Sequence, residues 1–190
     1  MKKLFLVLVV IFITGASLFA WEPADLTKFP IGQDGKSWIL NFGVGLSDLK
    51  ISSKGDTYIP RLRLSLDKNI GIGDKKLPFF AGGIVSYSGH GYKDDWNDWY
   101  TDDIFVGGRF GYHFNWNVKN LDTYAVTTTG AVVSSYKDKK YSNNNHNNID
   151  FSWGINLGVR YFISSGFGFW AETGFAYDAF NADIGLAFKF

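Results

Sequence analysis

The sequence predicts an all-β protein, an eight-stranded antiparallel up-and-down transmembrane β-barrel. Three observations lead to this fold class. Apolar residues recur with a period of two from residue 37 to the end, as in strands with one apolar and one polar face. Glycine (22 residues) and aromatic residues (18%) are abundant, which suits a small barrel with a filled interior and aromatic rims. After residue 20, no apolar run is long enough to form a membrane-spanning helix.

Cysteine content and charge exclude several classes of function. The chain has no cysteine, which rules out disulfides, zinc–thiolate sites and thiol catalysis. Its 19 Lys and Arg residues nearly balance 18 Asp and Glu residues, so there is no electrostatic case for binding nucleic acid. A length of 190 residues fits a single folded domain.

Residues 1–20 have the features of a secretory signal peptide. Lys2 and Lys3 form a charged start, and residues 4–13 are an apolar run too short to span a membrane. We expect cleavage after Ala20, and an uncleaved N-terminal anchor is the alternative. Residues 21–36 are predicted to be a periplasmic lead-in, and residues 37–190 to be the barrel.

The first four predicted strands alternate large apolar side chains with small or polar ones. Residues 38–47 set an aromatic and aliphatic face against asparagine and glycine, and residues 58–69 set leucines against arginine, serine and aspartate. The alternation is less clean in residues 78–88. It is clear again in residues 104–114, where glycine, arginine and histidine oppose the apolar face.

The last four predicted strands differ in how clearly they alternate. Residues 123–136 are the weakest, because three consecutive threonines blur the pattern, which a β-bulge would explain. Residues 151–163 are the clearest, with every second side chain large and apolar. Residues 167–177 and 182–190 complete a count of eight.

The predicted connections alternate in length. Segments 48–57, 89–103 and 137–150 are long and polar, whereas 70–77, 115–122 and 164–166 are shorter. Segment 178–181 is the exception, because it lies on the same side as the long connections but is itself short. Long extracellular loops and short periplasmic turns are typical of membrane barrels, and an even strand count places both termini on the periplasmic side.

The end of the chain carries a family resemblance. Ile184, Leu186, Phe188 and Phe190 share one face of the last strand, and the chain stops on Phe190. This segment resembles the C-terminal signature of bacterial outer-membrane barrels, and residues 38–190 resemble the small proteins of the OmpA, OmpX and OmpW kind. The resemblance implies a bacterial outer-membrane location, contact with outer-membrane lipid, and recognition of Phe188 and Phe190 by the barrel-assembly machinery. The soluble rival is a lipocalin-like barrel with the apolar parity inside.

Charged side chains on the other parity are predicted to meet in the lumen. Buried charges must be paired or hydrated, so we expect a structural network of ion pairs rather than an open pore. Glu172 is the predicted hub, contacted by Arg160 from the neighbouring strand and by Arg61 or Arg109 from across the barrel. Glycines on the same parity are expected to leave room for the long arginines. The predicted lumen network comprises Arg61, Arg63, Arg109, Arg160, Glu172 and Asp183.

Segment 93–103 is predicted to be an acidic, aromatic loop. Its carboxylates suggest a Ca²⁺ site, but the spacing does not match an EF-hand loop, and we expect no metal. Trp96, Trp99 and Tyr100 are the predicted contacts for an extracellular ligand, since exposed aromatic residues usually serve an interaction.

The sequence favours a structural or surface-interaction role for a monomeric barrel without a cofactor. A small passive channel is the alternative, and a lipid-modifying enzyme is a third, less favoured reading. Ser88 and His90 share one strand face, but no carboxylate is placed to orient the histidine, so we expect no enzymatic activity.

Overall fold

The structure, a computed structural model, describes residues 37–46, 56–72, 75–93, 98–114, 116, 118, 120–138, 146–176 and 179–190. The predicted signal peptide and lead-in, residues 1–20 and 21–36, lie outside the described residues. No described helix is long and apolar enough to cross a membrane.

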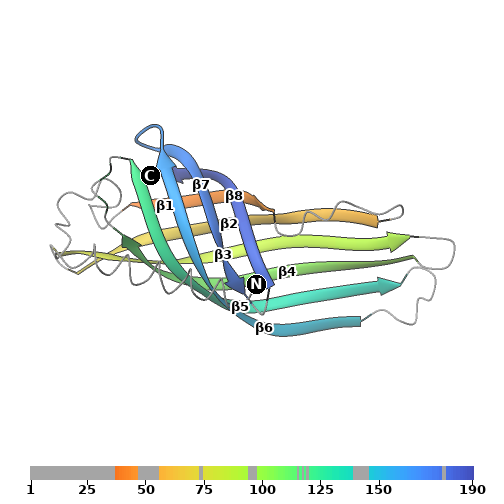
Figure 1. Ribbon diagram of the computed structural model, residues 1–190. Helices are drawn as coiled ribbons and strands as arrows, with labels where there is room; N and C mark the ends of the chain where they lie inside the picture. Colours follow the sequence, from red (N-terminus) through yellow and green to blue (C-terminus); the bar gives the residue numbers. More distant parts are fainter. Residues whose placement is uncertain are drawn as a thin grey trace, which may run out of the picture.

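The eight strands close into a barrel in which every strand pairs antiparallel with the next (Figure 1). The strands are β1 (Trp38–Gly45), β2 (Asp56–Ile72), β3 (Lys75–Lys93), β4 (Asp98–Phe114), β5 (Leu121–Asp138), β6 (His146–Phe162), β7 (Phe167–Ala176) and β8 (Ala179–Lys189). The predicted fold class of eight antiparallel strands in up-and-down order is confirmed.

The last strand closes the barrel against the first. Ile39 pairs with Lys189 and Gly45 with Asp183 at the two ends of this ladder. Beyond it, Trp38 N donates to Phe190 O at 2.8 Å, and Phe190 N donates to Trp38 O at 3.0 Å. Phe190 is therefore part of the closure.

The two faces of the strands have opposite character. Large apolar side chains point outward and are exposed, as in Phe42 (47%), Val106 (57%) and Phe169 (52%), whereas the alternate positions are buried in the lumen. A lipocalin-like barrel would bury the apolar parity, so its arrangement is the reverse of the one observed. Strand parity alone predicted which side chains face outward.

Several strands are longer than the sequence predicts. The loops expected at 48–57, 89–103 and 137–150 are wrong in extent, because β2 begins at Asp56, β3 and β4 reach Lys93 and Asp98, and β5 and β6 reach Asp138 and His146. These outer strand ends carry polar residues on both parities, so a period of two in hydrophobicity is absent there. Backbone pairing with the adjacent strands holds them in the sheet.

The β-bulge that would explain the blurred pattern of residues 123–136 is not found there. The pairing of β5 with both β4 and β6 is continuous. The register shifts lie instead between β2 and β3, at Ile59/Leu62 and Asn69/Gly71. Pro60 lies inside the first shift and has no N–H to donate to a ladder, which accounts for an irregularity at this place.

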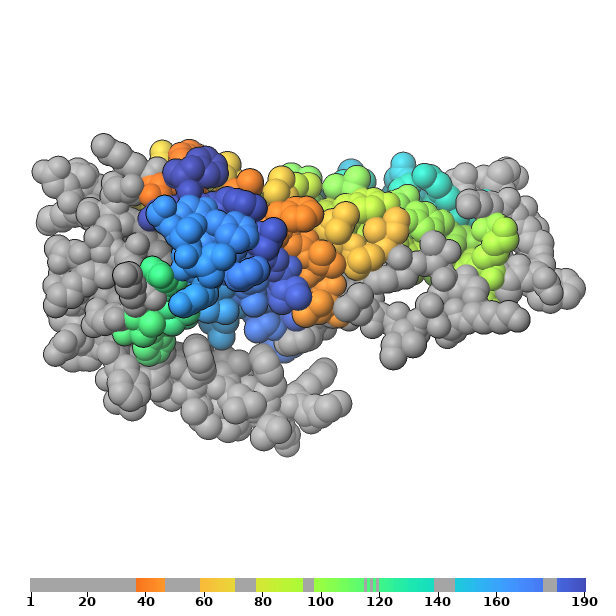
Figure 2. Space-filling view, turned by 90° about the horizontal axis from the view of Figure 1, so that it is seen from above, coloured from red at the N-terminus to blue at the C-terminus, as the bar shows by residue number. Residues whose placement is uncertain are grey.

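Five strands continue beyond the rim of the closed barrel. Among the described residues, β2 pairs with β1 only from Leu62, and β6 pairs with β7 only from Gly154. Figure 1 shows β2 to β6 running well past the ends of β1, β7 and β8, and Figure 2 shows the same extension from above. We call this extension the projecting sheet; it comprises residues 56–61, 88–93, 98–103, 134–138 and 146–148.

Candidate functional site

Strand alternation brings charged side chains from six strands into one lumen. Arg61, Arg63 and Asp67 share the inner face of β2 with a spacing of two, as strand geometry requires. The other members come from β4 to β8, and all but Arg61 are almost completely buried. These additional members are Arg109, Asp122, Arg160, Glu172 and Asp183.

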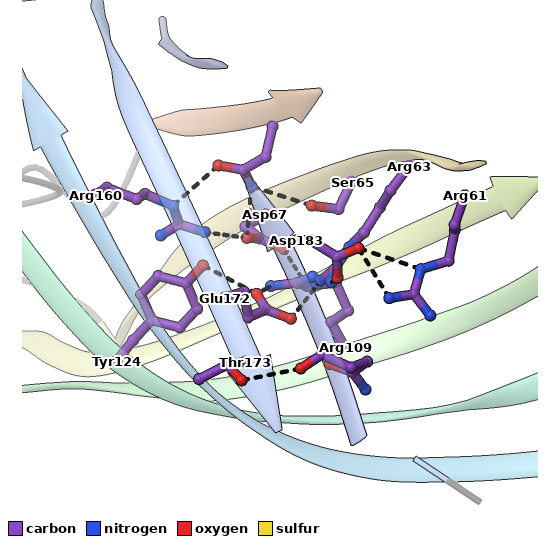
Figure 3. A network of polar contacts seen from close by, with 12 residues as sticks. Arg61, Arg63, Ser65, Asp67, Arg109, Tyr124, Arg160, Glu172, Thr173 and Asp183 are labelled. Atoms are coloured by element: carbon purple, nitrogen blue, oxygen red, sulfur yellow. Dashed lines mark hydrogen bonds and ion pairs between the residues drawn. The ribbon is translucent and has the colours of Figure 1, made fainter. Parts of the chain in front are cut away.

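Glu172 and Asp183 anchor one half of this network (Figure 3). Arg63 Nη2 lies 2.5 Å from Glu172 Oε1, and Arg109 Nη2 lies 2.9 Å from Glu172 Oε2. The Tyr124 hydroxyl donates to the same Oε2 atom at 3.0 Å. Asp183 accepts from Arg63 Nη1 at 2.6 Å and from Arg61 Nη2 at 3.0 Å. Each carboxylate thus holds two arginines.

Arg160 organises the other half. Its Nη2 pairs with Asp67, its Nη1 donates to Asp122 Oδ2 at 2.9 Å, and its Nε donates to Asn41 Oδ1 at 3.0 Å. His113 Nδ1 lies 2.6 Å from Asp122 Oδ1. Arg109 Nε lies 3.0 Å from Asp67 Oδ1 and links the two halves as an ion pair. The planar guanidinium groups suit such multidentate pairing.

Aromatic side chains surround the arginines. The Arg160 Cζ atom lies 4.2 Å from the centre of the Tyr124 ring, and Arg63 Cζ lies 5.1 Å from the centre of the Trp170 ring. Both distances fall within the range of cation–π attraction. Phe80 packs edge-on against Tyr124, with ring centres 5.4 Å apart. Charge pairing and ring packing together fill this part of the lumen.

The structure places the predicted lumen residues on the inner face but corrects two details. Arg160 does not contact Glu172. In the β6–β7 register it lies opposite Trp170, whereas Glu172 lies opposite Gly158, one inward position further along. Arg109 reaches Glu172 from across the barrel, whereas Arg61 reaches Asp183.

The interior glycines mostly accommodate rings rather than arginines, which is the second correction. A Cβ atom at Gly158 would lie 2.2 Å from the Tyr124 ring, and one at Gly111 would lie 2.2 Å from the Phe80 ring. A Cβ atom at Gly43 would lie 2.6 Å from Trp170. Gly45, beside the Arg61 side chain, fits the original expectation.

Sequence reasoning missed several members of the network, among them Asp122, His113 and Asn41. Asp122 was assigned to a turn, one residue before the predicted start of the fifth strand. His113 and Asn41 lie on the inner parity but were not included. Including every polar residue of the inner parity would have found His113 and Asn41, and a fifth strand begun at Leu121 would have included Asp122 as well.

The predicted ligand-contacting aromatics do not form one loop. Trp96 lies outside the described residues. Trp99 and Tyr100 belong to β4 and point to opposite faces of the projecting sheet. The Tyr100 side chain covers Gly89 and Gly91 of β3, where a Cβ atom would lie 2.3 Å from its hydroxyl oxygen and 2.6 Å from its ring.

Trp99 belongs to a row of rings on the inner face of the projecting sheet. Its ring centre lies 5.4 Å from that of His90, in an edge-on arrangement, and 6.1 Å from that of Tyr136. Tyr136 stacks in turn on His146, with centres 5.1 Å apart. We call these four residues the aromatic row; they come from four neighbouring strands, β3 to β6.

Metal binding and Ser–His chemistry find no supporting geometry in the described part of the chain. Within those residues, no group of three or more His, Asp or Glu side chains is arranged to hold a metal ion. Asp94 and Asp95 of the acidic segment lie outside the described residues. His90, on the same strand face as Ser88, packs its ring against Trp99.

Comparisons with known proteins give matches by structure alone. No family model and no curated protein matches the sequence. The chain resembles small bacterial outer-membrane β-barrels. One is Ail, the attachment invasion locus protein of Yersinia pestis, with 11% identity and a TM-score of 0.45 over 81% of this chain and 95% of that one.

Two further solved structures are similar. The N-terminal β-barrel domain of Pseudomonas aeruginosa OprF has 14% identity and a TM-score of 0.45, covering 81% of this chain and 96% of that one. Neisserial surface protein A has 12% identity and a TM-score of 0.49, covering 82% and 97%. The barrel fold of this chain is established by the pairing of its own eight strands.

Proposed function

We propose that this chain is a bacterial outer-membrane barrel whose projecting sheet serves interactions at the cell surface. The observation that carries the proposal is the continuation of β2 to β6 beyond the closed rim. A monomeric barrel needs only enough strand length to cross the bilayer, about 9–11 residues. Strands of 17 to 19 residues, as in β2, β3 and β4, exceed that length and lift a sheet away from the membrane.

The outward apolar surface supports the membrane placement. Exposed large apolar side chains surround the closed part of the barrel, among them Leu64 (41%), Phe110 (49%) and Ile184 (48%). A continuous surface of this kind is unfavourable in water and favourable in lipid. In this proposal outer-membrane lipid covers it, and the barrel-assembly machinery inserts the chain by way of β8.

The chemistry of the projecting sheet supports an interaction role. Its inner face carries the aromatic row, and aromatic residues are enriched at protein interaction sites. Its β6 margin, residues 146–148, has no described strand partner on the β7 side. Such an edge offers backbone donors and acceptors to an extended segment of a partner. We infer a binding role without catalysis.

The lumen network argues against the channel alternative. Glu172 and Asp67, each 2% exposed or less, are held by arginines from opposite sides of the barrel. An interior of eight strands is just wide enough for side chains to fill. The wild-type protein should therefore give little conductance in planar lipid bilayers. A large, stable conductance would favour the channel instead.

Single-cysteine labelling tests the placement of the projecting sheet, because the chain has no cysteine of its own. Asn148→Cys lies in the exposed end of β6, and Ser165→Cys lies in the exposed turn between β6 and β7. A membrane-impermeant maleimide should label the first variant in intact cells. It should label the second only after the outer membrane is permeabilised. The opposite pattern would contradict the proposed orientation.

The interaction role has a separate test. Purified protein in lipid nanodiscs is applied to arrays of immobilised glycans and peptides. The double variant Trp99→Ala/Tyr136→Ala, which removes the centre of the aromatic row, should lose the binding seen with wild type. Phe169→Ala, on the lipid-facing surface, is the matched control and should retain it. Wild-type binding no greater than that of empty nanodiscs would contradict the interaction role.

A further inference from the structure

A groove of about 930 Å³ lies on the outward face of the closed barrel, along β1 to β4. Small residues form its floor, because Ala81 and Gly83 are consecutive outward positions of β3, and Gly83 lies opposite Gly108 of β4. A Cβ atom added at Gly83 or Gly108 would meet no atom beyond its chain neighbours closer than 3.9 Å. The outward surface is therefore hollowed at this place.

Large apolar side chains form the sides of the groove. Leu66 of β2 lies opposite Gly83, and Leu64 lies opposite Val85 at the end that points toward the projecting sheet. Val85 and Val106, 41% and 57% exposed, close that end. None of these side chains can form a hydrogen bond, so the groove suits a hydrocarbon chain rather than a polar molecule.

The opposite end of the groove carries a positive charge. Lys68 lies opposite Ala81 of β3 and Trp38 of β1, and its Nζ atom lies 4.9 Å from the centre of the Trp38 ring. Among the residues that the structure describes, no carboxylate forms an ion pair with Lys68. Lysine and tryptophan together are typical of the interface between membrane and water. An anion at this end would compensate the charge of Lys68.

The groove extends from the membrane surface toward the midplane of the bilayer. Lys68 lies near the turn between β2 and β3, and its neighbour Trp38 pairs with Phe190 at the same end of the barrel. Strands rise about 3.3 Å per residue, so Lys68 and Leu64 lie about 13 Å apart along β2. This length is comparable with one leaflet of the hydrocarbon core, about 15 Å.

We propose that this groove binds one acyl chain of an anionic phospholipid, whose phosphate pairs with Lys68. Lipid tails are as apolar as the groove, so burial of apolar surface alone gives no preference for this place. Van der Waals contact with the walls and the charge of Lys68 select the bound lipid, because an unfilled groove loses both interactions. The lipid site rests on the proposed membrane placement but not on the surface-interaction role.

Native mass spectrometry of the folded barrel in a mild detergent tests the site. Palmitoyl-oleoyl phosphatidylglycerol is the anionic probe, and phosphatidylcholine with the same chains is the zwitterionic one. Each barrel should retain one phosphatidylglycerol, in preference to phosphatidylcholine by about 5-fold. Loss of all lipid from protein with normal heat-modifiable gel mobility would overturn the lipid site and leave the membrane placement, which cysteine labelling tests, unaffected. Equal retention of the two lipids would overturn the pairing of the phosphate with Lys68.

Leucine variants test whether the acyl chain occupies the groove. Gly83→Leu fills the floor with a side chain that has room to fit, so it should abolish lipid retention without lowering the free energy of unfolding. Ala171→Leu adds the same bulk to the outward face of β7, four strands away, and should retain the lipid. Equal loss of lipid in both variants would contradict the groove as the site. A stable dimer that Gly83→Leu disrupts would identify a second copy of the chain as the occupant and would also overturn the proposal.

Lysine variants test the contact with the headgroup. Lys68→Gln removes the charge and should lower the preference for phosphatidylglycerol about 5-fold, whereas Lys68→Arg should keep it. Lys93→Gln, at a 73% exposed side chain of the projecting sheet, is the matched control and should leave the preference unchanged. An unchanged preference in Lys68→Gln would refute the headgroup contact.

Discussion

Arg63 on β2 and Glu172 on β7 meet across the lumen, with Nη2 2.5 Å from Oε1, although β1 and β8 lie between their strands in the barrel. The two residues are 109 positions apart in sequence. A single ion pair thus ties together an early and a late part of the chain. Because Glu172 also holds Arg109, its carboxylate connects three sides of the wall.

Replacing this carboxylate should be costly. Glu172→Ala would leave Arg63 and Arg109 buried without their shared partner, which typically costs about 3–5 kcal/mol. Urea-induced unfolding in lipid vesicles should show a loss of this size. Asp98→Ala is the control, because Asp98 pairs with Lys93 at 3.5 Å in an exposed pair and should cost less than about 1 kcal/mol. Equal losses of unfolding free energy in the two variants would contradict a stabilising role for the lumen network.

Two isoleucines at different heights test the lipid-facing surface. Ile155 in the middle of β6 and Ile163 in the turn after it are both 57% exposed. Ile155→Arg should lower the free energy of unfolding in bilayers by about 2–4 kcal/mol, and Ile163→Arg by about 0–1 kcal/mol. If the outer surface faced water, the two substitutions would cost the same.

A pair of glycines tests the ring packing in the lumen. Gly158→Ala would place its methyl group 2.2 Å from the ring of Tyr124, whose hydroxyl donates to Glu172 Oε2. Such overpacking should cost about 1–3 kcal/mol in the same unfolding assay. Gly83→Ala is the control, since its Cβ would lie 3.9 Å from Gly107 O, its nearest neighbour, and should be tolerated. A tolerated Gly158→Ala would mean that Tyr124 moves freely.

The terminal aromatic residue tests assembly. Phe190 is 68% exposed and its backbone pairs with Trp38. Phe190→Ser should reduce the amount of protein in the outer membrane of producing cells, yet purified protein should refold in detergent with normal heat-modifiable gel mobility. Phe169→Ser, at another exposed aromatic position, should insert at a near-normal level. An unchanged outer-membrane yield for Phe190→Ser would refute an assembly role.

The alternation of single residues was enough to predict the strands and their faces, but not the partners of the lumen charges. Parity says that Arg160 and Glu172 both point inward. It does not say how the strands are staggered, and the observed stagger sets Arg160 opposite Trp170. Ion-pair partners across a lumen depend on the shear of the whole barrel, which no local pattern records.

Strand ends were poorly predicted for a different reason. Residues 98–103 of β4 are polar or amphipathic on both faces, so they show no hydrophobic period of two that could predict a strand. What holds them is the ladder to β3, from Asp98 opposite Lys93 to Asp103 opposite Ser88. Such non-local pairing is visible only once the neighbouring strand is in place.

The closure between β1 and β8 has a consequence for the order of folding. Ile39 and Lys189 are paired although 150 positions separate them, whereas Ile72 and Lys75 at the β2–β3 turn are nearly adjacent. Contacts between distant positions form slowly, because the intervening chain must first be confined. Hairpins should therefore assemble one after another, and the joining of β1 to β8 should be the slow step. Until β8 is in place, β1 has no partner on that side and the barrel stays open.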